Sequence, residues 1–135
     1  MTWGLLALVI AAAFTGAAIY INVAEHPARL GLSVGSLLTQ WKPSYARGFA
    51  IQASLAVLGA MLAALAWWTT GDGLWLAGAV VLGVALVGWG GIADAGAKLQ
   101  IDFVTGELWS GSYLWGYLFT AIAVAATLLA LVAAA

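Results

Sequence analysis

The sequence predicts an all-α integral membrane protein in which four helices cross the bilayer as a compact bundle. Of the 135 residues, 65% are hydrophobic and 7% are charged, and the mean hydropathy is +1.08, well beyond the range of soluble globular domains. Four stretches carry no charged residue, at 1–24, 48–71, 73–93 and 108–135, and each exceeds the roughly 20 residues of a spanning helix. These runs lack the alternation of barrel strands, so helices are the structure that satisfies the backbone inside lipid.

The four uncharged stretches give the helices in order. The first, at about 3–24, is expected to remain as a helix rather than to be a secretory signal, because no positive charge precedes it. The second and third are expected at about 48–68 and 74–95, joined by the link 69–73, whose Gly and Asp residues suit a tight turn. With a fourth helix at about 112–133, the whole chain is expected to form one domain.

The long link between the first two helices contains a further helical pattern. Its apolar residues recur at helical spacing, namely Leu30, Val34, Leu37, Leu38 and Trp41. This pattern predicts a short helix lying at the membrane interface. We expect that helix to end at Lys42, because the residue before a proline such as Pro43 is disfavoured in the α conformation.

The basic residues predict how the chain lies in the membrane. The links 25–47 and 96–111 fall on the same face, because two helices separate them. They contain every Lys and Arg of the chain: Arg29, Lys42, Arg47 and Lys98. The positive-inside rule therefore predicts that this face is cytoplasmic and that both termini lie outside.

An internal repeat predicts that the bundle is built from two parallel-related helical hairpins, residues 1–68 and 69–135. Ala24–Leu30 aligns with Ala93–Leu99, so an acidic residue followed four positions later by a basic one occurs in both halves. Since the first and third helices point the same way, the pseudo-two-fold axis should follow the membrane normal.

Two features of the structure would test this repeat. We expect the aromatic residues of the two halves to superpose, with Tyr20 on Trp89 and Tyr45 on Tyr113. The two related links also differ in charge, and we expect ion pairs that join Lys42 or Arg47 to Asp102 or Glu107.

Polar residues gather where the first helix is expected to end. Asn22, Glu25, His26 and Arg29 would share one face if the helix continued beyond residue 24. Pro27 would kink such an extension, because it removes a backbone donor. The simpler interpretation is an interfacial helix end in which Glu25 and Arg29 form an ordinary i, i+4 ion pair.

His26 is the single histidine of the chain and its obvious proton-transfer group near neutral pH. As a general base it would act with Arg29, Tyr45 and Arg47, whose donors could stabilise a developing oxyanion. We expect its ring to face the interior, within reach of Tyr45 or Arg29 and beside an apolar cavity.

The composition argues against several other classes of protein. The chain has no cysteine, which excludes disulfides, thiolate nucleophiles and Cys-ligated metals. A metal site at His26 would need oxygen donors such as Glu25, Asp94, Asp102 or Glu107, and these follow no ligand-spacing motif, so neither a metal nor a cofactor is expected. A net charge of -1 with four basic residues excludes an electrostatic nucleic-acid surface.

The segments Asn22–Leu30 and Trp41–Gly48 contain the motifs E-H-P-A-R and W-x-P-S-Y-x-R. In these motifs the chain resembles the anthrone-oxygenase-like family of small four-helix membrane proteins. The resemblance covers roughly the first half and implies an oxygenase that acts on a lipophilic aromatic substrate without an evident cofactor motif. The second half departs from the family pattern, because Trp109 is followed by Tyr113 and Gly116 where the family has His and Arg. Either the chemistry differs, or the fold is kept and the activity is lost.

Two functions of different classes follow from these observations. The first is a membrane oxidoreductase with its site at the cytoplasmic ends of the first two helices, where an aromatic substrate enters from lipid. The second is a non-catalytic bundle that binds a partner, lipid or pigment, or that forms a homo-oligomer through small-residue pairs such as Ala12 and Gly16. A small transporter is a third reading, but no span carries a charge at its midplane.

Overall fold

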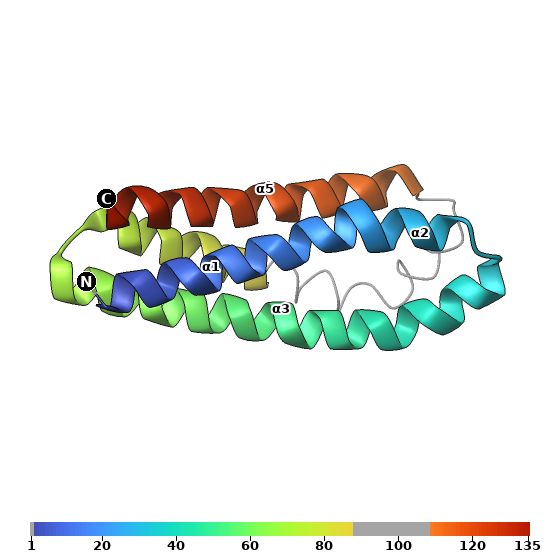
Figure 1. Cartoon of the computed structure of the whole chain (residues 1–135), viewed down its shortest axis with the longest axis horizontal. Coiled ribbons are helices and arrows are strands. Elements are labelled where there is room, and N and C mark those ends of the chain that lie inside the picture. Colours follow the sequence, from blue (N-terminus) through green and yellow to red (C-terminus); the bar gives the residue numbers. More distant parts are fainter. Residues whose placement is uncertain (1, 88–108) are drawn as a thin grey trace.

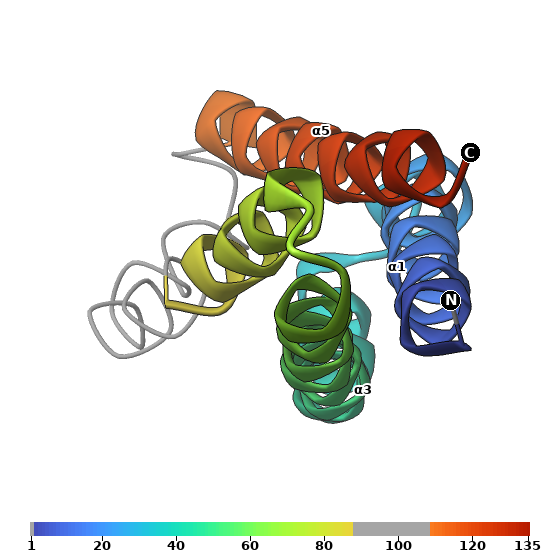
Figure 2. The ribbon, with the colours of Figure 1, turned by 90° about the vertical axis from the view of Figure 1, so that its left-hand side faces the viewer.

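The computed structural model describes residues 2–87 and 109–135, and these ranges are helical apart from short connections. No strand occurs in the described part, where the predicted all-α class is therefore confirmed. The helices of the described ranges lie alongside one another, and the two chain ends lie at the same end of the molecule (Figure 1). Seen from that end, the first helix lies between the second and the last, and the third fills the opposite side (Figure 2).

The first helix is longer than the sequence predicts. It runs without a break through α1 (Thr2–Tyr20), the π-helical turn η1 (Ile21–Glu25) and α2 (His26–Leu30). In η1 the ladder widens, and the backbone N–H of His26 donates to the carbonyl of Ile21, five residues earlier. This wide turn directly precedes Pro27, which has no N–H to continue the α-helical ladder. The expected helix end at residue 24 is therefore wrong.

The second helix, α3, also extends beyond its predicted bounds. It runs from Val34 to Thr70, so the separate interfacial helix that was expected to end at Lys42 is instead its first part. Ser33, in extended conformation, precedes its first turn, and the carbonyl of Ser33 accepts from the N–H of Leu37. Pro43 lies inside the helix. A proline removes one backbone bond and bends a helix without ending it when the flanking turns are held, and α3 curves over this part in Figure 1.

A tight turn joins α3 to the helix Gly73–Val87, as the sequence predicts. Gly71 adopts the left-handed conformation with φ 74°, and its N–H donates to the carbonyl of Trp67 at 2.7 Å. The Asp72 side chain then accepts from the N–H of Leu74 at 2.9 Å and caps the start of the next helix. The two helices consequently run antiparallel.

The last helix, α5, spans Trp109–Ala134 and so begins a turn before the predicted position. It packs along α1, which also contacts α3 over much of its length. The helix that precedes α5 in the sequence is described as far as Val87. The predicted end of that helix at residue 95 lies outside the described residues.

The interior is built mainly from alanine. On α1 the buried residues follow helical spacing, at Gly4, Ala7, Ala11, Phe14 and Ala18. Two clusters join all four helices: Phe14, Ala18, Ala56, Leu82, Ala85, Ala123 and Ala126 in one, and Ala7, Ala63, Ala66, Trp75 and Ala130 in the other. Small side chains allow the helix backbones to approach closely. In two places a glycine meets a large side chain, with Gly4 against Trp75 and Gly59 against Leu82.

Two of the described helices are long and apolar enough to cross a membrane. They are Thr2–Arg29, with 28 residues, and Gly35–Thr70, with 36. At a rise of 1.5 Å per residue their lengths are about 42 and 54 Å, whereas the hydrocarbon core of a bilayer is about 30 Å thick. Each could therefore cross the core and extend beyond it.

Candidate functional site

The continuous first helix carries the predicted polar residues along its second half. Because the helix continues beyond residue 24, Asn22 and Glu25 lie on η1, and His26 and Arg29 lie on α2. A π turn within a helix often marks a functional site, because the widened ladder displaces side chains from regular α-helical positions. The sequence interpretation required the first helix to continue beyond residue 24, and it does so. The continuation passes through a π turn instead of a regular α-helical turn.

Arg29 and Glu25 form the ion pair that their spacing predicts. The guanidinium Nη2 of Arg29 lies 2.7 Å from Oε2 of Glu25, and the pair is also a hydrogen bond. Arg29 is only 8% exposed, whereas the Glu25 side chain retains about a third of its exposure. A charge-assisted hydrogen bond of this length offsets part of the cost of burying the guanidinium. The pair is therefore more than a solvated contact on a helix surface.

His26 is half-buried, and its Nε2 atom is inaccessible to solvent. This agrees with an imidazole that faces the interior, as a base that serves an enclosed substrate would need. The pocket that Gln52 lines, described below, is not lined by His26. It is therefore not the apolar cavity that was expected beside the imidazole.

Tyr45 and Arg47 lie on α3 and differ in their surroundings. The Tyr45 ring stacks between two others of the same helix, with centroids 4.8 Å from Trp41 and 6.5 Å from Phe49. Arg47 is exposed. Of the four predicted site residues, His26 and Arg29 are therefore neighbours on the first helix, Tyr45 belongs to an aromatic stack on α3, and Arg47 faces outward.

Polar contacts between the continuous first helix and α5 are a feature that the sequence interpretation missed. Thr15 Oγ1 and Thr127 Oγ1 lie 2.9 Å apart, and Asn22 Nδ2 donates to Thr120 Oγ1 at 2.7 Å. Asn22 also donates to the Ala18 carbonyl at 3.0 Å. The signal was present in the spacing, because each helix contributes polar residues seven apart, as two antiparallel helices in register require.

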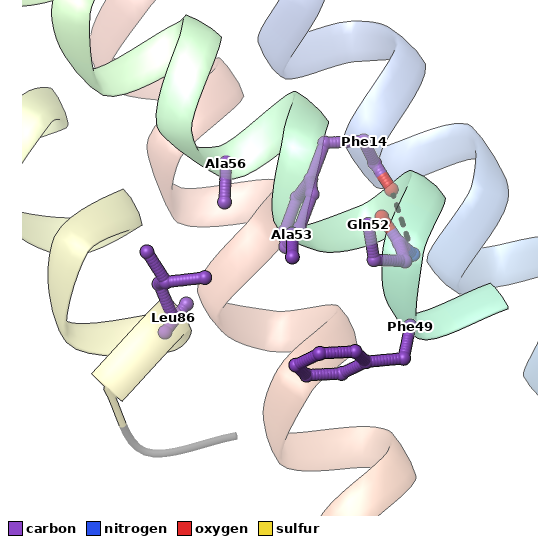
Figure 3. Close-up of a pocket in the computed structure, with 7 residues that line it drawn as sticks. Phe14, Phe49, Gln52, Ala53, Ala56 and Leu86 are labelled. Carbon is purple, nitrogen blue, oxygen red and sulfur yellow. Dashed lines mark hydrogen bonds between the residues drawn. The ribbon is translucent and has the colours of Figure 1, made fainter. Parts of the chain in front are cut away.

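A second feature that was missed is a buried amide between the helices. Gln52 of α3 is 5% exposed, and its Nε2 donates to the Phe14 carbonyl of α1 at 3.5 Å (Figure 3). It lines a small pocket together with Phe14, Phe49, Ala53, Ala56, Ala85 and Leu86. The available signal was a lone amide within the uncharged run 48–71.

The predictions for the second half of the chain fall largely outside the described residues. These are the superposition of Tyr20 on Trp89, the repeated acidic and basic residues within Ala93–Leu99, and the ion pairs of Lys42 or Arg47 with Asp102 or Glu107. The repeat and these ion pairs therefore stay predictions. Comparison of the chain with family models, with curated proteins and with solved structures finds no match.

Proposed function

We propose that this chain is an integral membrane protein whose four helices form a transmembrane bundle. The support is the distribution of side-chain size: alanine fills the interior, while large apolar residues are exposed on every helix. Examples are Val23 at 71% exposure, Met61 at 59%, Val87 at 75% and Val132 at 64%. A soluble protein would bury such side chains, whereas lipid solvates them at no cost and selects small residues for helix contacts.

The proposed orientation follows from the basic residues. Arg29, Lys42 and Arg47 belong to the hairpin of α2 and the first part of α3, while the opposite end has Asp72 in its turn. The positive-inside rule then supports a cytoplasmic position for the α2–α3 end and outside positions for both termini.

We further propose that the polar segment Asn22–Arg29 is the site of an oxidoreductase that acts on a lipophilic aromatic substrate. The observation that carries this proposal is the sequestered Nε2 of His26 next to a π turn and the Glu25–Arg29 pair. A neutral imidazole in such a place can accept a proton from an acidic C–H or O–H group of a substrate. Arg29 then stabilises the resulting anion electrostatically.

The overall reaction must include an electron acceptor, for which dioxygen is sufficient. Conversion of a methylene group of an anthrone to a carbonyl consumes one dioxygen and releases one water. In this scheme His26 removes one methylene proton, the carbanion carbon bonds to dioxygen, and the protonated imidazole returns the proton to the peroxide oxygen. His26 then removes the second C–H proton while the O–O bond breaks, so that the carbonyl forms and hydroxide leaves. The imidazolium protonates this hydroxide, which departs as the one water. Tyr45 is the further hydroxyl donor that the resemblance of the motifs to anthrone oxygenases suggests.

The test is turnover by the full chain in lipid nanodiscs. Anthrone would be supplied with dioxygen, and the quinone formed would be separated by chromatography. We expect His26→Ala to lower the rate by about 10² to 10⁴, while Gln40→Ala, an exposed change on α3, leaves it unchanged. The proposal fails if the wild-type chain does not exceed protein-free nanodiscs, or if His26→Ala retains full activity while its near-UV circular dichroism is native.

A non-catalytic bundle is the second candidate, and the Arg29 environment favours it. Because Arg29 is almost wholly buried and already paired with Glu25, little of its charge remains for a substrate anion. If the bundle is not catalytic, Arg29→Gln should lower the thermal midpoint of unfolding and leave the rate of quinone formation at the protein-free level. Loss of turnover at unchanged stability would instead favour the enzyme.

A further inference from the structure

The pocket at Gln52 is distinct from the proposed oxidoreductase site. It lies among three helices, since Phe14 comes from α1, Gln52 from α3 and Leu86 from the helix Gly73–Val87. Figure 3 shows these side chains around the unfilled space. His26 follows Phe14 by twelve residues, which is roughly 18 Å along the helix axis. A ligand in this pocket is therefore remote from the imidazole.

The amide of Gln52 has a fixed orientation. The Phe14 carbonyl can only accept, so the Gln52 group that faces it must be the NH₂ and not the carbonyl oxygen. The amide oxygen Oε1 is buried and accepts no hydrogen bond within the described part of the chain. Buried acceptors in proteins nearly always have a donor, and an exception calls for an explanation.

The lining of the pocket indicates what kind of donor fits. Apart from Gln52, every lining residue within the described part of the chain is Phe, Ala or Leu, so their side chains offer no hydrogen-bonding atom. An ordered water typically makes about three hydrogen bonds, and among the described lining residues only the Gln52 side chain supplies polar atoms. A molecule with one donor and an otherwise apolar surface matches the lining better.

We propose that this pocket binds a lipophile through a single hydroxyl group, which donates a hydrogen bond to Oε1 of Gln52. The apolar part of the molecule packs against the rings of Phe14 and Phe49 and against Leu86. The space that a water-sized group can enter is about 10 Å³, and the wider unfilled space of about 240 Å³ includes the open side of the pocket. The enclosed part accordingly holds the hydroxyl alone, while the carbon chain lies along the open side. Such a ligand comes from the bilayer.

The probes that test this are decan-1-ol and decyl methyl ether, which have similar apolar chains but differ in the hydroxyl donor. The full chain in lipid nanodiscs, labelled with ¹⁵N-glutamine, is titrated with each compound. We expect the alcohol to shift the Gln52 side-chain resonance saturably and to raise the thermal midpoint. The ether should bind about tenfold more weakly or not at all, since it cannot donate to Oε1. Gln40, which is exposed, serves as the internal reference.

Two variants separate the amide from the cavity. Gln52→Met keeps most of the side-chain length but removes the acceptor, and should abolish the preference for alcohol over ether. Ala53→Leu keeps the amide and fills part of the pocket, and should abolish binding of both compounds even if Gln52→Met does not fold. The matched control Gln40→Met should bind as the wild-type chain does.

The proposal is overturned if alcohol and ether bind equally, if neither perturbs the Gln52 resonance, or if that amide exchanges magnetisation only with water. These outcomes do not depend on His26 or on turnover. Failure of the oxidoreductase assay and failure of this binding assay can consequently be told apart.

Discussion

The contact between Gly4 and Trp75 provides a sharp test of the packing. A Cβ atom added at Gly4 would lie 2.5 Å from Cζ2 of Trp75 and 3.0 Å from Cη2. Carbon atoms pack best at about 3.5 to 4.0 Å, so in Gly4→Ala the new methyl group and the Trp75 ring would have to move apart by about 1 Å. Trp75 is only 4% exposed and packs against Ala7, Ala63 and Ala66, which leaves the indole little room to move.

The magnitude follows from two opposing effects. Overpacking of a well-filled core raises the free energy of the folded state by about 1 to 3 kcal/mol. Alanine is favoured over glycine within a helix by up to about 1 kcal/mol. Gly16→Ala is the matched control on the same helix, because a Cβ at Gly16 meets nothing within 4 Å and gains only the second effect. Gly4→Ala should therefore be less stable than Gly16→Ala by about 1 to 3 kcal/mol.

The assay is thermal unfolding of the full chain in detergent, followed by near-UV circular dichroism of the tryptophans. A double-mutant cycle with Trp75→Phe adds a second readout, because phenylalanine lacks the indole atoms that the added methyl group would meet. We expect Gly4→Ala to cost less in the Trp75→Phe background than in the wild type. Equal stability of Gly4→Ala and Gly16→Ala would refute the close approach of α1 to the helix Gly73–Val87.

Two further predictions concern polar and backbone features. Asn22→Ala and Thr120→Ala should each destabilise the chain, because the 2.7 Å hydrogen bond joins η1 to α5. The coupling free energy between them should be about 0.6 kcal/mol and at most about 1.7, so strictly additive effects on the unfolding free energy would contradict this contact. Gly71→Ala should cost about 1 to 2 kcal/mol, since φ is 74° there. The control Gly73→Ala meets no neighbour and should be neutral or stabilising by up to about 1 kcal/mol in the same unfolding assay, so equal effects of the two would argue against the left-handed turn.

The helices could be predicted from the sequence because their cause is local. In the proposed bilayer, an uncharged apolar run of more than about 20 residues satisfies its backbone as a helix wherever it occurs in the sequence. The turn at Gly71 and Asp72 follows from residue type alone. The helix end at Pro43 was predicted by an equally local rule, and it was wrong. A proline removes one bond, but the turns on both sides of Pro43 belong to a helix that packs on α1 over much of its length.

The inward face of each helix was harder to predict. Since nearly every residue of α1 is apolar, hydrophobic periodicity does not distinguish its inner and outer faces. Residue size does distinguish the two faces, because four of the five buried residues of α1 are glycine or alanine and only Phe14 is large. For the same reason the burial of Gln52 could not be predicted, because it depends on how α3 is rotated about its axis. The Glu25–Arg29 pair was predictable because it needs only i, i+4 spacing within one helix.

The two polar contacts between the continuous first helix and α5 have a consequence for how far these helices can slide past each other. Apolar surfaces made of alanine and leucine are nearly interchangeable from one turn to the next, so in the proposed bilayer they would resist sliding only weakly. The threonine pair at Thr15 and the amide contact at Asn22 lie about 10 Å apart along α1, and the partners on α5 have the same separation. A displacement by one turn would break both contacts together and place four polar side chains against apolar surface. The depth at which α5 sits against α1 is thus determined by four side chains, whereas the apolar surface determines only that the helices associate.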